Sequence, residues 1–73
     1  MWLYRSPIGN IYIKQLSDGR YGLVHNGTVW ESSHTPEAEA DNVYMKCTGC
    51  SQWDCLKISY LDIPTDLSEW EEI

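Results

Sequence analysis

The stretch that decides the fold is HTPEAEADNVYMKCTGCSQWD, residues 34–54. Thr35 suits the N-cap of a helix, and Pro36 suits the first helical position, where its missing N–H costs nothing. Glu37 and Glu39 place acids in the first turn, at the positive end of the helix dipole. Gly49 suits the left-handed C′ position that ends a helix. These signals predict one helix whose apolar stripe, spaced at i, i+3, i+4 and i+7, consists of Ala40, Val43, Tyr44 and Cys47.

The residues before the helix predict an antiparallel meander of three or four strands within residues 2–32. The clearest strand alternates around Ile11 and Ile13, which share one face. A small sheet is marginal alone in water, so we expect the helix to cover that face.

The dipeptide Asn26-Gly27 predicts a type I′ hairpin turn, because such a turn needs positive φ at both central residues. In the strand that follows, simple alternation puts Val29 and Glu31 on one face and Trp30 on the other.

After the helix, residues 51–54 are predicted as a loop in which Trp53 closes the core and Asp54 accepts backbone N–H bonds. The alternation of residues 56–60 predicts one further strand, at a sheet edge. Thr65 or Asp66 could cap a short C-terminal helix that holds Leu67 and Trp70. The expected fold is one α+β domain over residues 1–73: a three- to four-stranded antiparallel meander packed on one central helix, then a further short strand and an acidic C-terminal turn or helix.

The net charge of −6 is unevenly distributed along the chain. Residues 1–30 hold three basic residues and one acidic residue, a balance of +2, whereas residues 31–73 hold ten acidic and two basic residues, a balance of −8. The acidic part therefore argues against binding to a phosphate backbone and favours a solvated face or a basic protein partner.

No apolar run has the length of a membrane span, and the first residues do not resemble a signal peptide. We therefore expect a cytoplasmic protein, without membrane contact, whose three cysteines stay reduced.

Two resemblances add to this interpretation. The helix start Thr35-Pro36-Glu37-Ala38, the turn Thr48-Gly49-Cys50 and the pair Trp53-Asp54 resemble a family of small bacterial proteins, over about residues 20–54. Glu39 and Met45 depart from the usual pattern of that family. No activity is assigned to the family, so the resemblance implies no catalytic residue. More weakly, three strands before one helix are similar to AP2-type and integrase-arm DNA-binding modules, which read DNA with a basic sheet face.

The spacing Cys47-x-x-Cys50, with Cys55 nearby, is compatible with a zinc site, but a fourth ligand is not evident. The simpler interpretation is that Cys47 and Cys50 fill core space around the helix end. Cys50 lies near a helix C-terminus, where the dipole disfavours a thiolate, so a catalytic thiol is not expected. We interpret His25 as a strand-end residue and His34 as a loop residue before the helix cap.

These observations predict a non-enzymatic, acidic protein–protein interaction module of unknown partner, for example an inhibitor encoded by a phage or mobile element. No catalytic residue, cofactor or metal ligand is predicted. The alternatives are a nucleic-acid-binding module that uses the basic N-terminal sheet, and a zinc-stapled structural domain. An edge strand near Trp2 or Tyr60 could also pair two copies into a homodimer. The candidate partner-binding residues are Trp2, Trp30, Glu37, Asp41, Asn42, Trp70, Glu71 and Glu72.

Overall fold

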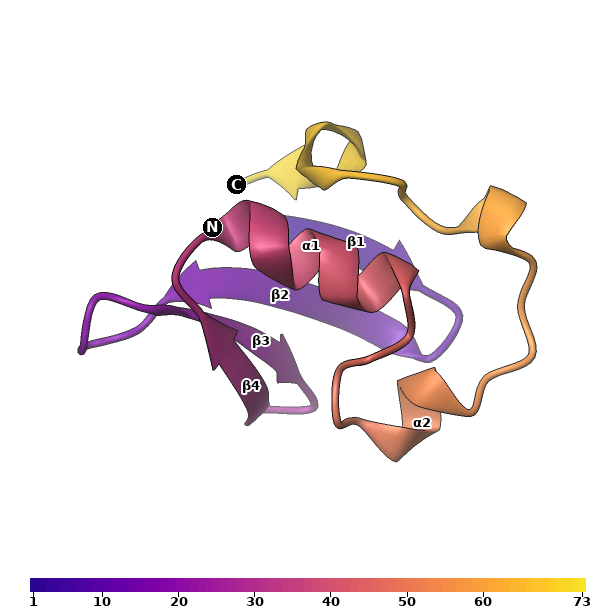
Figure 1. Ribbon diagram of the computed structural model, residues 1–73, viewed down its shortest axis with the longest axis horizontal. Helices are drawn as coiled ribbons and strands as arrows, with labels where there is room; N and C mark the ends of the chain where they lie inside the picture. The colour runs from indigo at the N-terminus through magenta and orange to yellow at the C-terminus, as the bar shows by residue number, and fades with distance from the viewer.

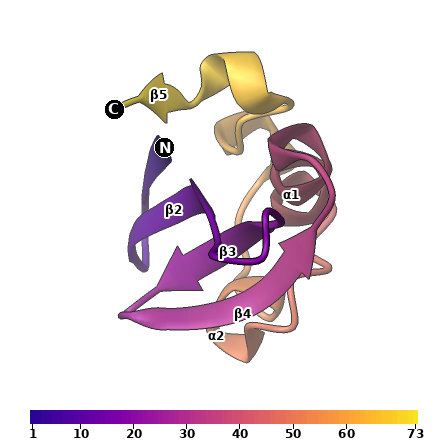
Figure 2. The same ribbon diagram turned by 90° about the vertical axis from the view of Figure 1, so that its left-hand side faces the viewer.

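Five antiparallel strands form one sheet in the order β4-β3-β2-β1-β5, and the main helix lies against one face of it (Figures 1 and 2). The computed structural model describes all residues, 1–73. The strands are β1 (Trp2–Ser6), β2 (Gly9–Gln15), β3 (Tyr21–His25), β4 (Thr28–Ser33) and β5 (Glu71–Glu72). The helices are α1 (Pro36–Tyr44) and α2 (Ser51–Asp54), with single 3₁₀ turns η1 (Tyr60–Asp62) and η2 (Leu67–Glu69). The predicted α+β class, with a meander on one central helix and a further short strand, is confirmed.

The β3–β4 hairpin has the predicted turn. Asn26 has φ of 53° and Gly27 has φ of 73°, as a type I′ turn requires. Ile11 pairs with His25 and Ile13 pairs with Leu23, so these four side chains share one face of the sheet. All four are buried beneath the helices.

A bulge in β4 changes the expected alternation. Leu23 pairs with Glu31, whereas the next residue, Val24, pairs with Val29, so Trp30 is left without a partner in β3. Because Leu23 faces the helix, its partner Glu31 faces it too, while Val29 lies on the opposite face. The expectation that Val29 and Glu31 share a face was therefore wrong.

Helix α1 begins as predicted and ends earlier than predicted. The Thr35 hydroxyl accepts a bond of 3.2 Å from the N–H of Ala38, which caps the N-terminus. At the other end, Lys46 has φ of 56°, and the N–H groups of Lys46 and Cys47 donate to the carbonyls of Val43 and Asn42 at 3.1 and 2.9 Å. This pair of bonds is a Schellman motif with Lys in the left-handed position.

Because the helix ends at Tyr44, Cys47 leaves the apolar stripe and is exposed. Its predicted role as a core residue was wrong, whereas Ala40, Val43 and Cys50 are buried.

Residues 51–54 form the short helix α2 and not the predicted loop, but the roles predicted for Trp53 and Asp54 are confirmed. The Trp53 side chain is buried, and its Nε1 donates to the Val43 carbonyl at 2.9 Å. The Asp54 carboxylate accepts from the N–H groups of Thr48 and Gly49, each at 3.0 Å, and from the Thr48 hydroxyl at 2.7 Å. The turn that follows α1 is thereby tied to α2.

Residues 56–59 form no strand, contrary to the prediction. The ammonium of Lys46 donates to the carbonyl of Leu56 and to that of Ile58, so this segment wraps around the end of α1 (Figure 1). The further short strand lies instead at Glu71–Glu72, antiparallel to β1. Asp66 caps η2 by accepting from the N–H of Ser68 at 2.9 Å, as predicted.

Candidate functional site

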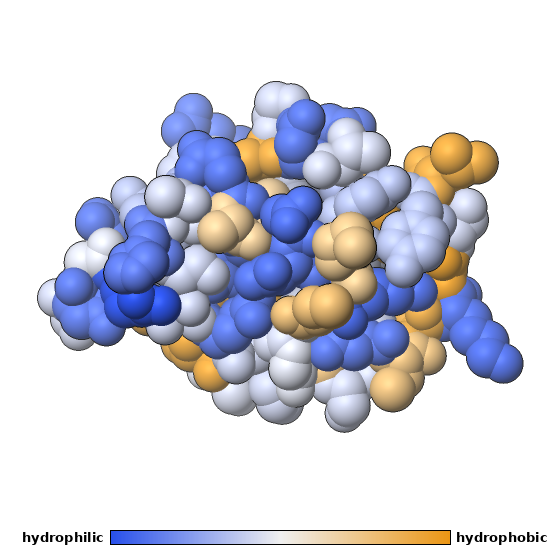
Figure 3. All heavy atoms as spheres, in the orientation of Figure 1, coloured by the Kyte–Doolittle hydropathy of each residue, from blue (hydrophilic) through white to orange (hydrophobic).

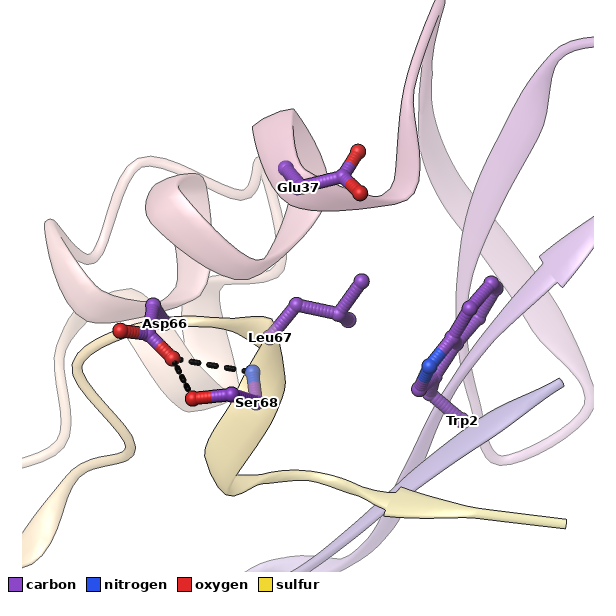
Figure 4. Close-up of a pocket in the computed structure, with 5 residues that line it drawn as sticks. All are labelled: Trp2, Glu37, Asp66, Leu67 and Ser68. Carbon is purple, nitrogen blue, oxygen red and sulfur yellow. Dashed lines mark hydrogen bonds between the residues drawn. The ribbon is translucent and has the colours of Figure 1, made fainter.

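One open hollow of about 440 Å³ lies between the starts of β1, α1 and η2. Its walls come from three regions that are far apart in the sequence (Figure 4). The lining residues are Trp2, Glu37, Asp66, Leu67 and Ser68. The fold therefore brings an indole, a leucine side chain and two carboxyl groups to one place on the surface.

Trp2 forms one wall of the hollow. It is the first residue of β1 and pairs with Ile13, a buried residue of the helix-covered face, so its side chain points to the same side of the sheet. Its ring meets the ring of Tyr21 edge-to-face, with centroids 6.1 Å apart and planes at 62°. This contact holds the half-buried indole in place.

The two carboxylates differ in their hydrogen bonds and in their direction. The Asp66 carboxylate accepts from the N–H and the hydroxyl of Ser68, and Figure 4 shows it turned away from Trp2. The Glu37 carboxylate lies on the Trp2 side of the hollow, above Leu67 (Figure 4). The only ion pair in the chain joins Arg5 to Glu71 at 3.3 Å, so Glu37 has no cationic partner.

The structure places some of the predicted partner-binding residues in or near the hollow and the others elsewhere. Trp2 and Glu37 meet in the hollow. Glu71 and Glu72 lie beside them in β5, where both are exposed and Glu71 is paired with Arg5. Asp41 is exposed one turn further along α1. Asp66, Leu67 and Ser68 were not predicted as site residues, because no local signal in the sequence assigns them to a site shared with β1.

Three other candidates lie elsewhere. Trp70 is only 6% exposed and packs on Tyr4, with ring centroids 5.5 Å apart, so its prediction as a surface contact was wrong. Asn42 does not point freely to solvent, because its amide donates to Glu31 at 3.0 Å. Trp30 is 41% exposed, but it lies in the β4 bulge and does not line the hollow.

Glu39 is the least expected side chain. It is fully buried between α1 and β4, and neither carboxyl oxygen has a hydrogen-bond partner of ordinary geometry. Burial raises the pKa of Glu39 to about 8, and the neighbouring Glu31 carboxyl adds to the rise, whereas Ser33 and Arg20 oppose it. Burial therefore favours the protonated form of this side chain at neutral pH.

The histidines have the structural positions expected of them. His25 is buried at the end of β3, and its Nε2 lies 2.8 Å from the Ile8 carbonyl, to which it donates. His34 is exposed before the helix cap, 3.5 Å from the Arg20 guanidinium.

The three cysteines are free thiols. Cys50 is buried, and Cys47 and Cys55 are exposed. No group of three or more His, Cys, Asp or Glu side chains is arranged to hold a metal ion.

A second exposed feature lies between α2 and η2. Leu61 is 96% exposed, next to Tyr60, whose ring packs on Tyr44 with centroids 5.4 Å apart. No hollow is associated with these residues.

A scan against protein-family models, a search of curated proteins and a search of solved structures found no match to this chain. The resemblance to a small bacterial family therefore stays a prediction. None of the helices combines the length and the apolar character needed to cross a membrane.

Proposed function

We propose that the chain is a non-enzymatic, acidic protein–protein interaction module whose contact surface centres on the hollow between β1, α1 and η2. The observation that supports this proposal is the position of Glu37, an unpaired carboxylate beside the half-buried indole of Trp2. Tryptophan is enriched among the residues that dominate binding energy at protein interfaces, and complementary charges around such a residue help to select the partner.

The charge around the hollow indicates the sign of the partner. Asp66, Glu69 and Glu72 belong to the same end of the molecule as Glu37, and Arg5 is already paired with Glu71. In Figure 3 hydrophilic side chains cover most of the visible face, and apolar ones are scattered or lie near its edges. A basic partner fits this surface better than an apolar one. A cytoplasmic location is part of the same proposal.

The experiment compares what the intact protein and its variants capture from a lysate of the native host. Wild type is expected to capture one dominant protein, and Glu37→Lys is expected to lose it, because the reversed charge repels a basic partner. Asp18→Lys makes the same exchange in the hairpin between β2 and β3 and is expected to retain the partner. Equal capture by all three proteins, or no specific capture, would refute the proposal.

A further inference from the structure

We propose that the hollow formed by Trp2, Leu67 and Glu37 binds the side chain of an arginine in a basic segment of the partner protein. This inference rests on the proposed function and specifies the chemistry that the hollow recognises.

The three groups suit the three parts of an arginine side chain. Figure 4 shows the Leu67 side chain reaching toward Trp2, with the Glu37 carboxylate above both. The methylene groups of an arginine can pack on Leu67, its guanidinium plane can lie on the indole of Trp2, and its N–H groups can donate to Glu37. An anionic ligand would meet Glu37 and Asp66 and find no cation among the lining residues.

The chain's own arginines are engaged elsewhere. The Arg20 guanidinium donates to the hydroxyl and the carbonyl of Ser32, each at 3.0 Å, and Arg5 pairs with Glu71. Neither lines the hollow. The charge of Glu37 is therefore available to a group from outside the chain.

Arginine fits better than lysine for two reasons. Its planar guanidinium stacks on an aromatic face, and it loses less hydration energy than a compact ammonium ion when it does so. It can also donate two parallel bonds to one carboxylate while it stacks. The hollow is open, so the backbone of the partner can run along the surface while one side chain enters.

The test titrates the intact, ¹⁵N-labelled protein with three capped pentapeptides that differ only at the central residue: arginine, lysine or citrulline. Citrulline keeps the shape of arginine without its charge. The indole N–H resonances of the four tryptophans report the place of binding. The arginine peptide is expected to shift the Trp2 resonance and leave that of buried Trp53 unchanged, with lysine weaker and citrulline silent.

Two variants test the contacts. Trp2→Leu and Glu37→Gln are each expected to weaken binding about two- to fivefold, the loss of one exposed cation–π contact or one exposed ion pair. Asp18→Asn removes an exposed carboxylate in the hairpin between β2 and β3, away from the hollow, and is expected to leave affinity unchanged. Glu37 is exposed, so Glu37→Gln remains informative even if Trp2→Leu fails to fold.

The outcomes separate this inference from the proposed function. If a partner is captured through Glu37 but the arginine peptide leaves Trp2 unshifted, the inference is wrong and the proposed function stands. If the arginine peptide shifts the Trp2 resonance and the variants weaken its binding, but no partner is captured, the hollow recognises arginine and the proposed function is wrong. Equal shifts by the arginine and citrulline peptides would also overturn the inference.

Discussion

Replacing Glu39 with Gln is expected to stabilise the protein at neutral pH. The Glu39 carboxyl is fully buried without a hydrogen-bond partner of ordinary geometry, and its pKa is raised from 4.5 to about 8. At pH 7 the unfolded chain would ionise this group while the folded protein keeps it protonated. The difference destabilises the folded state.

The magnitude follows from the two pKa values. Between 4.5 and 7 the penalty grows by about 1.36 kcal/mol per pH unit, which gives an upper value of about 3 kcal/mol at pH 7. An amide at this position still has to find buried hydrogen-bond partners, and the Glu31 and Ser33 side chains are the nearest polar groups. The expected net gain for Glu39→Gln is therefore about 1–2 kcal/mol.

The destabilisation caused by Glu39 is expected to increase with pH. Below pH 4.5 both states of the wild type are protonated at Glu39, so this group adds no penalty. The penalty grows from pH 4.5 to about 8 and is constant above that, when the folded state ionises too. The stability advantage of Glu39→Gln over wild type should therefore increase across this interval.

Urea unfolding followed by tryptophan fluorescence, repeated between about pH 5 and 9, measures this difference. Glu37→Gln is the matched control, because it removes an exposed carboxyl two residues earlier in the same helix and is expected to change stability by less than about 0.5 kcal/mol. A stability difference for Glu39→Gln that does not change with pH, or a loss of stability at pH 7, would refute the reasoning.

Three further predictions concern the turns and the cysteines. Asp54→Ala is expected to lower the free energy of unfolding by about 2–3 kcal/mol, because two N–H groups and a hydroxyl lose their acceptor. Urea unfolding measures this loss, with the exposed Asp41→Ala as the control. Equal stability of the two variants would contradict the prediction. Gly27→Ala is expected to lower the free energy of unfolding by about 1 kcal/mol. The φ of Gly27 is 73° and no neighbour lies within 4 Å of the added Cβ, so only backbone strain acts. A loss larger than that of Asp54→Ala would show that this account is wrong. Protein purified without added zinc is expected to contain no stoichiometric zinc by elemental analysis, because no three His, Cys, Asp or Glu side chains are arranged to hold a metal ion. One zinc per chain would favour the alternative of a zinc-stapled domain.

Several features could be predicted because their causes are local. The type I′ turn at Asn26-Gly27 follows from the φ values that these residues tolerate. The helix start follows from the Thr35 cap and the proline after it. The alternation of Ile11 and Ile13 gives the buried face of the sheet. For these elements, neighbouring residues carry enough information.

The candidate site could be predicted only in part. Trp2 and Glu37 were predicted as partner-binding residues, but the hollow that they share also needs Leu67, which lies 30 residues or more from either along the chain. The error at Trp70 has the same origin. Its burial depends on contact with Tyr4 of β1, and an acidic neighbourhood in the sequence gave no sign of it.

The sequence by itself determined the strands of the meander, the tight hairpin turn, the start of α1 and the tie between Asp54 and the turn before it. Only the tertiary structure decided where α1 ends, where the last short strand pairs, and which acids are buried. The bulge at Trp30 turns Glu31 toward α1, and the sheet and helix together remove Glu39 from water. The physical reason is the separation of the interacting residues along the chain. Turns and caps are set by hydrogen bonds and φ values of near neighbours, whereas burial, strand pairing and the hollow depend on surfaces that meet only after the chain has folded.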